Sequence, residues 1–549
     1  MVWNARPVAL SRASFRRAAL VVAVGVACVM WTGFLTEVAR HTRYGSSDNA
    51  NALLAGREMV RGNPFLRGWV LPPDSYWLLD LPILGLASVV FGMREVLLHA
   101  VPAALTVGAV VAGVWVAGID RPGRRRWVAA GVLALVIGLP HRYLSFFILQ
   151  GPHHLATTLF CLVAFGLLSK ARLGSVRWAA AVSLLAMAVF SDAIAVAIGV
   201  APVVGAGVVD ALRRRRVSAL ATPLAAAVAA MAGSVALRGL VAVAGGFALE
   251  PTLDYFPLWR TNLRAAPGVL ESLVGAGANT GLSPFPAAVH ALVAGLIMVL
   301  ALVTLIRLVV DVVRPRPENE GVRSESTGWR ERPGAGWGDA ALLLGAVAGI
   351  VVFALLTPPA AARASARYLL PVLVFGAVLA ARRAQEVAQR LPAWPVVAVG
   401  LALGAVYMTA PLQAVRAPEP VNPSEGVVRW LRSQRLDRGY GQYWVAGITT
   451  VTSGGAVVVR PVQPADQGLQ PHVGFASTRW FDAGTDRHPF RFVILQPADD
   501  GGVDETRAAT TFGPPESEQT IGPYRVLVWD HDLRPMLPRA VNPWSSARG

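Results

Sequence analysis

A single carboxylate follows the first apolar run of the chain. The stretch GSSDNANALLAG, residues 45 to 56, places Asp48 between Ser47 and Asn49. Such residues often cap helices, because their side chains accept hydrogen bonds from the first backbone amides. A carboxylate at a membrane surface can also act as a general base, since partial desolvation raises its pKa. We predict that Asp48 is a catalytic base, and helix capping is the alternative.

Two further acids lie in the segment LPPDSYWLLDLPILGLASVVFG, residues 71 to 92. Asp80 interrupts an apolar run, where an unpaired charge is costly and therefore indicates function. Salt bridges from Asp74 and Asp80 to Arg57, Arg61 or Arg67 would explain these acids equally well. The guanidinium groups of Arg57 and Arg61 could instead contact a phosphate. We treat Asp74, Asp80, Arg57 and Arg61 as candidate substrate-binding residues.

A second group of candidates carries positive charge or imidazole. Arg142, His153 and His154 lie in PHRYLSFFILQGPHHLATTL, and Arg367 and Tyr368 begin the stretch RYLLP. The two arginines could contact a phosphate, although Arg367 could also simply reach the membrane surface. Adjacent histidines cannot both face one way from a helix, so hydrogen bonding to a substrate is favoured over a metal site. No cofactor is assigned, and a divalent cation remains open because carboxylates serve as base or ligand.

These residues belong to a chain whose composition indicates an integral membrane protein. Hydrophobic residues make up 54% of the 549 residues and charged residues 15%, and the mean hydropathy is +0.49. The net charge is +17, but the arginines come in short blocks between apolar runs. That pattern indicates membrane orientation and not nucleic-acid binding. The two cysteines, Cys28 and Cys161, lie in apolar runs and support neither a disulfide framework nor a metal centre.

The apolar runs predict about eleven membrane spans. They lie at residues 18–35, 94–118, 127–140, 155–169, 176–191, 193–211, 218–246, 286–310, 339–357, 367–382 and 393–411. Residues 75–92 are apolar but interrupted by Asp80 and Pro82. If this segment does not cross, the basic blocks near residues 121–126, 170–177, 213–216, 314–333 and 382–383 all fall on the cytoplasmic side. We therefore predict a cytoplasmic N-terminus and an interfacial or re-entrant helix at residues 75–92.

The hydrophobic pattern changes after Leu412. PSEGVVRWLRSQRL predicts an amphipathic helix, whereas QYWVAGITTVT, GAVVVRPV, FRFVILQP and YRVLVWDHDL are short runs typical of strands. The expected fold is thus an α-helical polytopic membrane domain at residues 1–411, whose first outer loop, residues 37–92, contains interfacial helices. An extracytoplasmic α/β domain is expected at residues 412–549.

This order of features resembles the GT-C superfamily of membrane glycosyltransferases. The resemblance rests on an acid soon after the first span in SSDNANALLAGREMVRGNPF, on the outer segment that starts with PP and ends with FG, and on RYLLP late in the chain. It also rests on the plan of a polytopic half followed by an extracytoplasmic domain. Many members carry two adjacent acids, where this chain has Asp48 and then Asn49.

The resemblance implies transfer of a sugar from a polyprenyl-phosphate donor to a glycan, lipid or protein acceptor outside the cell membrane. Asp48 would take the acceptor proton, and arginines would stabilise the lipid phosphate. Membrane lipid is a further expected partner, and nucleic acid is not. The alternatives are a transporter or flippase of lipid-linked sugars, which Asp192 and Arg238 within apolar runs would suit, or a non-enzymatic cell-envelope assembly protein.

Overall fold

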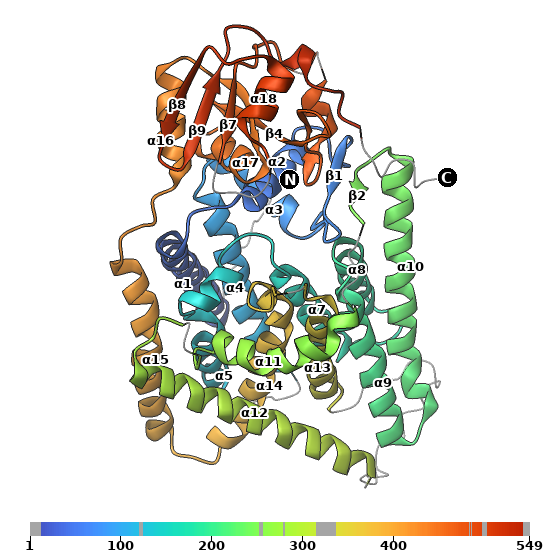
Figure 1. The fold of residues 1–549 in the computed structure, drawn as a ribbon. Helices are drawn as coiled ribbons and strands as arrows, with labels where there is room; N and C mark the ends of the chain where they lie inside the picture. Colours follow the sequence, from blue (N-terminus) through green and yellow to red (C-terminus); the bar gives the residue numbers. More distant parts are fainter. Residues whose placement is uncertain are drawn as a thin grey trace, which may run out of the picture.

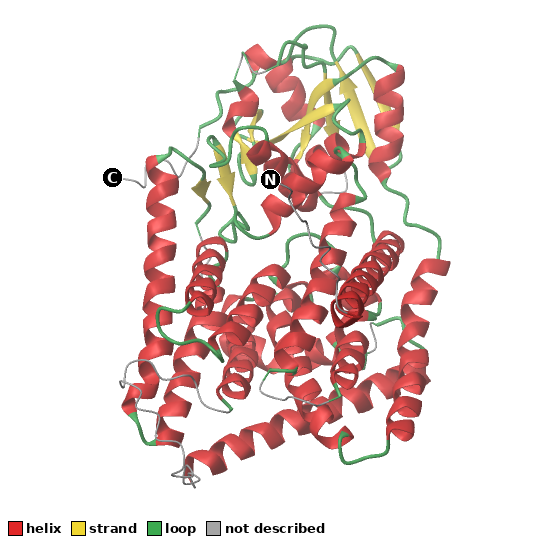
Figure 2. Cartoon of the chain, turned by 180° about the vertical axis from the view of Figure 1, so that it is seen from behind, coloured by secondary structure: helices red, strands yellow, loops and turns green. Residues whose placement is uncertain are grey.

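The protein is an α-helical bundle with an α/β domain at one end (Figures 1 and 2). The computed structural model describes residues 12–119, 125–251, 256–277, 280–313, 336–358, 360–482, 484, 486–496 and 502–541. The basic residues expected to orient the chain at 121–124 and 314–333 lie outside the described residues. The fold class expected from the sequence, a multi-pass membrane protein with a C-terminal α/β domain, is confirmed.

Helices account for every apolar run in the first 416 residues. They are α1 (Arg12–Thr42), α2 (Ser47–Val60), α3 (Asp80–Phe91), α4 (Leu97–Ala117), α5 (Arg126–Leu133) continued by η1 (Ala134–Gly138), α6 (Arg142–Ile148), α7 (Leu155–Leu168), α8 (Val176–Ser191), η2 (Val196–Val200) with α9 (Ala201–Arg214), η3 (Val217–Leu220) with α10 (Ala221–Val243), η4 (Phe256–Leu258), α11 (Trp259–Leu273), α12 (Pro284–Val313), α13 (Trp337–Leu356), η5 (Ala364–Leu369) with α14 (Leu370–Ala388), and α15 (Ala393–Arg416).

Each of the eleven predicted runs is helical. Within the described residues, eight helices are long and apolar enough to cross a membrane, and a ninth crossing results if α5, η1 and α6 form one span bent by 93°. The remaining two runs are the shorter apolar helices α7 and α8. α3 has 12 residues and is therefore about 18 Å long, well short of a hydrocarbon core of about 30 Å. This length is consistent with the predicted interfacial helix.

Helices α2 and α3 cross in backbone contact, and this crossing sets the spacing of the first outer loop. A Cβ at Gly56 would overlap the Leu81 carbonyl oxygen and lie 2.8 Å from the Gly85 nitrogen. A Cβ at Gly85 would in turn overlap the Gly56 carbonyl oxygen. Small residues permit such close approach between helices. Because α2 carries Asp48 in its first turn and α3 begins at Asp80, the crossing holds both acids in place.

We expect Gly85→Ala to lower the free energy of unfolding by about 1–3 kcal/mol, because the added methyl group meets backbone that cannot move aside. The measurement is thermal unfolding of the purified chain in detergent. Gly400→Ala in α15 is the matched control, since a Cβ there meets nothing within 4 Å. An unfolding temperature equal to that of Gly400→Ala would show that α2 and α3 do not cross in this way.

The α/β domain contains one six-stranded sheet with the order β5-β4-β3-β7-β9-β8. Its elements are α16 (Pro423–Ser433), β3 (Arg438–Gln442), α17 (Tyr443–Thr452), β4 (Val458–Pro464), β5 (Leu469–Pro471), η6 (Thr478–Phe481), β7 (Phe492–Leu495), α18 (Glu505–Phe512), β8 (Ser517–Ile521), β9 (Tyr524–Val528) and η7 (Arg534–Met536). The strands predicted in GAVVVRPV, FRFVILQP and YRVLVWDHDL are β4, β7 and β9.

The strand predicted in QYWVAGITTVT is wrong, because this run forms α17. Strands β3 and β4 are parallel neighbours, and parallel neighbours need a crossover connection, which is usually a helix. Seven of the ten α17 residues are buried. A helix buried on most sides lacks the polar face that would have identified it in the sequence.

A second, three-stranded sheet joins the domain to the membrane part. β1 (Trp69–Leu71), between α2 and α3, pairs in parallel with β2 (Ala248–Leu249) and antiparallel with β6 (Ala476–Ser477) of the domain. Ile448, Val451 and Phe475 also belong to the same hydrophobic core as the membrane helices. The domain is therefore packed directly onto the segment between α1 and α4, as Figure 1 shows above α2 and α3.

Candidate functional site

Asp48 lies in the first turn of α2, at the junction with the α/β domain. The N-cap of α2 is Ser46, whose hydroxyl accepts from the Asn49 backbone N–H at 3.4 Å. Asp48 is therefore not the capping residue, and its carboxylate is available for other contacts. Its Oδ1 accepts a hydrogen bond from the Tyr443 hydroxyl of the domain. The capping alternative thus does not account for Asp48.

The surroundings of Asp48 favour a carboxylate that binds protons more readily than usual. Burial raises the pKa of Asp48, and this effect outweighs the Tyr443 hydrogen bond and the positive charges of Arg367 and Arg43, which lower it. A raised pKa makes a carboxylate a better proton acceptor near neutral pH. These neighbours come from the domain, from η5 and from the end of α1.

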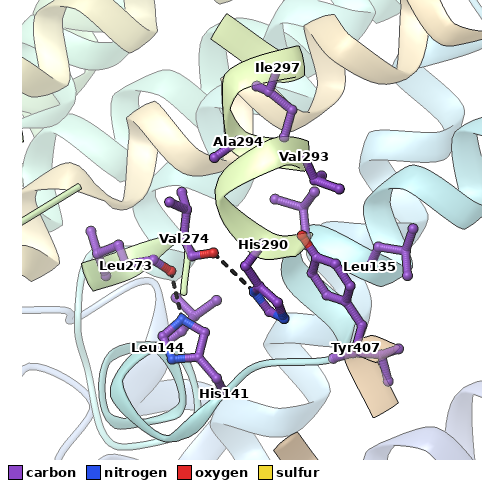
Figure 3. A pocket seen from close by; sticks show the side chains of 12 residues that line it. Leu135, His141, Leu144, Leu273, Val274, His290, Val293, Ala294, Ile297 and Tyr407 are labelled. Atoms are coloured by element: carbon purple, nitrogen blue, oxygen red, sulfur yellow. Dashed lines mark hydrogen bonds between the residues drawn. The ribbon is translucent and has the colours of Figure 1, made fainter. Parts of the chain in front are cut away.

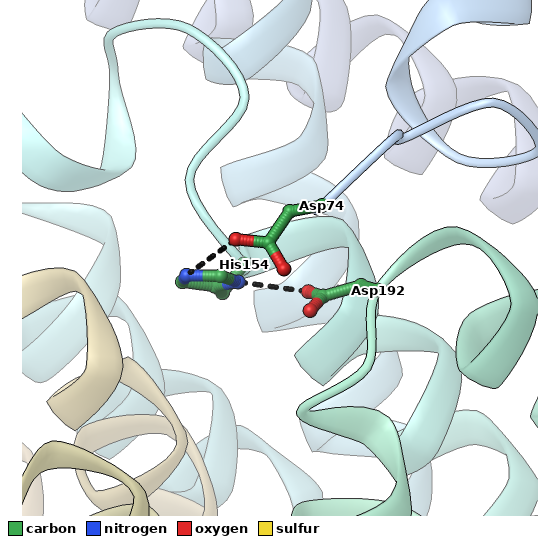
Figure 4. A group of neighbouring side chains, drawn as sticks. All are labelled: Asp74, His154 and Asp192. Carbon is green, nitrogen blue, oxygen red and sulfur yellow. Dashed lines mark hydrogen bonds and ion pairs between the residues drawn. The ribbon is translucent and has the colours of Figure 1, made fainter. Parts of the chain in front are cut away.

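A group of three side chains, the Asp–His–Asp cluster, consists of the half-buried Asp74 and the buried His154 and Asp192 (Figure 4). The His154 ring lies between the carboxylates. Its Nδ1 is 2.8 Å from Asp192 Oδ2, and its Nε2 is 3.9 Å from Asp74 Oδ2. The Thr157 hydroxyl also donates to Asp192. Because the Asp192 carboxylate accepts a hydrogen bond from His154 Nδ1–H, it orients the ring so that Nε2 faces Asp74.

The cluster is built from three separate connections. Asp74 lies between β1 and α3, His154 precedes α7, and Asp192 ends α8. His154 has a φ of +30°, and Tyr76, beside Asp74, has a φ of +51°. Non-glycine residues rarely adopt this left-handed conformation, and where they do, the strain often marks a functional site. The Tyr76 backbone N–H donates to the Ser191 carbonyl at 3.0 Å, which ties two of the connections together.

Burial and mutual repulsion shift the acids of this region. Burial, with a smaller contribution from Asp192, raises the pKa of Asp74 to about 7. The same two causes raise the pKa of Asp80 to about 7. Burial lowers the pKa of His154, but the negative charges of Asp192 and Asp74 outweigh this effect, so that the pKa of His154 is raised. The pKa of Asp192 is lowered despite its burial, because His154 and Thr157 stabilise its charge.

The Asp–His–Asp cluster has the donor set of a divalent cation site. One ligand atom from each residue lies within 4.8 Å of the others. His154 Nε2 is buried and has no hydrogen-bond partner in the part of the chain that the structure describes. Carboxylate oxygens and imidazole together suit several divalent ions. The residues therefore fit such an ion, with Asp74 and His154 Nε2 as ligands and Asp192 as a ligand or as the group that orients the ring.

Arg367 connects the cluster to Asp48. Its positive charge acts on both Asp48 and Asp74. The guanidinium carbon lies 5.2 Å from the ring centre of Tyr368, and Tyr368 stacks on His154 with ring centres 4.9 Å apart. Among the described residues, the buried Arg367 Nε has no hydrogen-bond partner. A guanidinium with a free N–H donor can bind an anion such as a phosphate.

The structure brings together most of the residues singled out in the sequence. Asp80 interacts electrostatically with His154 and Asp192, and it has no ion pair with the arginines of the first outer loop within the described residues. His153 is adjacent to His154, feels the charge of Arg367, and uses Nδ1 to contact the Phe147 carbonyl at 3.1 Å. The gathered candidates are Asp48, Asp74, Asp80, His153, His154, Arg367 and Tyr368.

Three predicted phosphate contacts lie apart from this group. Arg57 and Arg61 are near the far end of α2, so Arg57 is displaced by nine residues, or about 13 Å, along the helix from Asp48. The charge that acts on Arg57 is that of Arg61. Arg142 is exposed at the start of α6. Their roles as substrate-binding residues stay predictions.

Asp192 and Tyr443 are the members of the site that were not predicted as site residues. Asp192 carried a usable signal, because an acid within an apolar run is expensive unless it is paired. Tyr443 carried none, since 395 residues separate it from Asp48. Aromatic residues in its segment are explained equally well by packing within the domain.

A small pocket elsewhere in the bundle contains two more buried histidines (Figure 3). His141 contacts the Leu273 carbonyl and His290 the Val274 carbonyl, each at 3.0 Å. Tyr407 stacks on His290 with ring centres 3.8 Å apart. The space of about 10 Å³ suits one water molecule. In Figure 3 the other nitrogens of the two rings point in different directions, so the pair is not arranged around one ion.

Comparisons with known proteins identify similar structures. No protein-family model and no curated protein sequence matches the chain. The chain is similar to ArnT from Cupriavidus metallidurans bound to undecaprenyl phosphate, with 15% identity, a TM-score of 0.49, and coverage of 93% of this chain and 98% of that chain. It is similar to the oligosaccharyltransferase AglB from Archaeoglobus fulgidus in complex with an inhibitory peptide and a dolichol-phosphate, with 12% identity, a TM-score of 0.42, and coverage of 85% and 69%.

Both similar proteins are GT-C membrane glycosyltransferases.

Proposed function

We propose that this chain is a GT-C-type membrane glycosyltransferase that moves a sugar from a polyprenyl-phosphate donor to an acceptor on the extracytoplasmic face. The observation that carries the proposal is the arrangement around Arg367. Its charge acts on Asp48 and on Asp74 of the Asp–His–Asp cluster, and the adjacent Tyr368 stacks on His154. A base, a cation for a phosphate and a largely buried polar cluster are thereby gathered where the membrane helices meet the α/β domain.

Each step of the transfer can be assigned to groups of this site. The acceptor oxygen bonds to the anomeric carbon while the bond from that carbon to the phosphate oxygen breaks, and the electron pair leaves with the lipid phosphate. Asp48 takes the proton of the acceptor hydroxyl. Arg367 stabilises the charge on the departing phosphate, and the low dielectric of the site strengthens that attraction.

The proposed topology follows from the same site. The basic block at residues 170–177 lies between α7 and α8, and the block at residues 213–216 lies between α9 and α10. Asp192 lies at the other end of α8, and β2 follows the other end of α10. Placing these blocks in the cytoplasm puts Asp48, the cluster and the α/β domain outside. A lipid-linked donor would then reach the site from the outer leaflet.

The test is an assay of the purified chain in liposomes that contain a polyprenyl-phosphate-linked sugar, with soluble glycan, lipid and peptide acceptors. We expect a new glycosidic bond and release of polyprenyl phosphate. Leaflet exchange of the donor is followed in the same vesicles. Exchange without any new glycosidic bond would contradict the proposal and favour a flippase.

We expect chelation to reduce transfer, since the cluster fits a divalent cation. Such an ion would supply positive charge for the phosphate beside Arg367. EDTA treatment followed by dialysis should lower the rate by at least about tenfold, and Mg²⁺ or Mn²⁺ should restore it. Metal content per chain is measured in parallel for the wild type and for Asp74→Asn. Full transfer by a metal-free preparation would show that the cluster works without an ion.

A further inference from the structure

Tyr443 is the residue through which the α/β domain reaches Asp48. Its hydroxyl donates a hydrogen bond to Asp48 Oδ1. Tyr443 begins α17, directly after the carboxyl end of β3. β3 lies between β4 and β7 and runs parallel to both. In α/β sheets, the carboxyl end of a strand where the chain turns to opposite sides is a common place for a functional site.

Close packing of α17 on α2 fixes the position of this hydroxyl. The Ile448 backbone N–H lies 3.5 Å from Ser47 Oγ. A Cβ at Gly447 would overlap the Asn51 side chain and lie 3.3 Å from the Ser47 carbonyl oxygen. A side chain at residue 447 would therefore have to displace Asn51 and press on the α2 backbone. The Tyr443 ring is held on its other side by His472, with ring centres 4.8 Å apart.

We propose that Tyr443 is a positioning residue for Asp48, so that the α/β domain completes the catalytic site and does not merely cover it. This inference rests on the proposed function, in which Asp48 is the base. With Oδ1 held by the hydroxyl, Oδ2 is the oxygen that receives the acceptor proton. Partners of this kind fix the orientation of a catalytic group, whose rate depends on its alignment with the transferred proton.

The charged and titratable groups that face Asp48 come from four elements. They are Tyr443 of α17, Arg367 of η5, Arg43 after α1, and Glu250 after β2. The Tyr443 hydrogen bond and the two arginines favour the charged carboxylate, whereas burial disfavours it. Glu250 repels it. Removing the hydroxyl deletes one of the groups that stabilise the charged carboxylate, while burial and the charge of Glu250 still disfavour it. The pKa of Asp48 therefore rises further.

Tyr443→Phe tests the proposal because it keeps the ring and deletes the hydroxyl. A base must be deprotonated, so transfer falls as the pH drops through the pKa of Asp48. In the variant we expect this acid limb to move to higher pH by about one unit, which is about a tenfold lower rate on the limb. The maximal rate should also fall, while the KM for the polyprenyl-phosphate donor stays the same, because the role proposed for Tyr443 is to orient Asp48 and not to bind the donor.

Tyr440→Phe is the matched control. Tyr440 is also buried in the domain, but its ring stacks on Phe512 in the domain's own core, with ring centres 5.9 Å apart. It should show the acid limb and maximal rate of the wild type. Unfolding of Asp48→Ala, Tyr443→Phe and the double variant gives a second readout that needs no activity. We expect the two substitutions to be non-additive, because they remove the same hydrogen bond.

The outcomes separate the inference from the proposed function. Full transfer by Asp48→Asn would overturn the proposed base and with it the role of Tyr443. Loss of transfer in Asp48→Asn, together with a wild-type acid limb in Tyr443→Phe and additive unfolding energies, would overturn the role of Tyr443 alone. A shifted limb together with non-additive unfolding energies is the result that the geometry predicts.

Discussion

Asp48→Asn is expected to lower glycosyl transfer by about 10²–10⁴-fold, the usual contribution of a positioned general base. Asn has nearly the same shape as Asp but cannot accept the acceptor proton. Its side-chain oxygen can still accept from the Tyr443 hydroxyl, so the contact between α2 and α17 is preserved. The measurement is transfer by purified variants at equal abundance. Thermal unfolding confirms that each variant is folded.

The pH dependence of wild-type transfer shows whether the charged form of Asp48 is the active one. Burial raises the pKa of Asp48, so the carboxylate is present above that pKa and is lost as the pH falls through it. Wild-type transfer should therefore decline on the acid side, and the residual activity of Asp48→Asn should lack the part of that decline that Asp48 causes. Asp80→Asn makes the same change at another buried acid and should retain more transfer. Equal losses in the two variants would remove the special role of Asp48.

Asp192→Asn is expected to lower transfer by about 10–100-fold, as does loss of a group that orients a catalytic or ligating imidazole. It is also expected to lower the free energy of unfolding by about 3 kcal/mol, because it breaks a fully buried pair. The Asp192 carboxylate accepts from His154 Nδ1 and from Thr157. Both of these bonds end on Oδ2, and Oδ1 accepts from the Ile194 backbone N–H at 3.3 Å. An amide has only one acceptor oxygen, so its NH₂ group would face a donor at one of the two positions.

Asp210→Asn separates the loss of orientation from the loss of stability. Asp210 is 2% exposed and pairs with Arg214 at 3.2 Å near the end of α9. This variant should lose stability and keep its transfer rate per folded molecule. Transfer rate and unfolding temperature are measured for both variants. If Asp192→Asn kept the same rate per folded molecule as Asp210→Asn, the Asp–His–Asp cluster would have no part in the reaction.

The membrane helices could be predicted from the sequence because their signal is local. Runs of apolar residues, and their interruption at Asp80 and Pro82, distinguish α3 from the helices that are long enough to cross. The same reasoning identified Asp80 as costly unless it has a partner. It could not identify that partner, since the neighbours Asp192 and His154 come from connections far along the chain.

The contacts of the α/β domain could not be predicted, because they depend on docking between distant segments. The run that forms α17 is short, apolar and rich in β-branched residues, and periodicity alone does not distinguish such a helix from a strand. With α17 taken as a strand, Tyr443 had no reason to approach Asp48. Arg57 and Arg61 are close to Asp48 in the sequence but not in space, because the length of α2 separates them from it.

In the proposed site, Arg367 and Asp48 together form the place where a lipid phosphate leaves its sugar. This arrangement can be seen directly in a structure of the full chain bound to a polyprenyl phosphate, determined by electron cryomicroscopy in lipid nanodiscs. We predict that the phosphate lies within hydrogen-bond distance of the Arg367 guanidinium, next to Asp74 and on the same side of the helix bundle as Asp48. A phosphate bound at Arg142, or at Arg57 and Arg61, with Arg367 uninvolved, would rule this arrangement out.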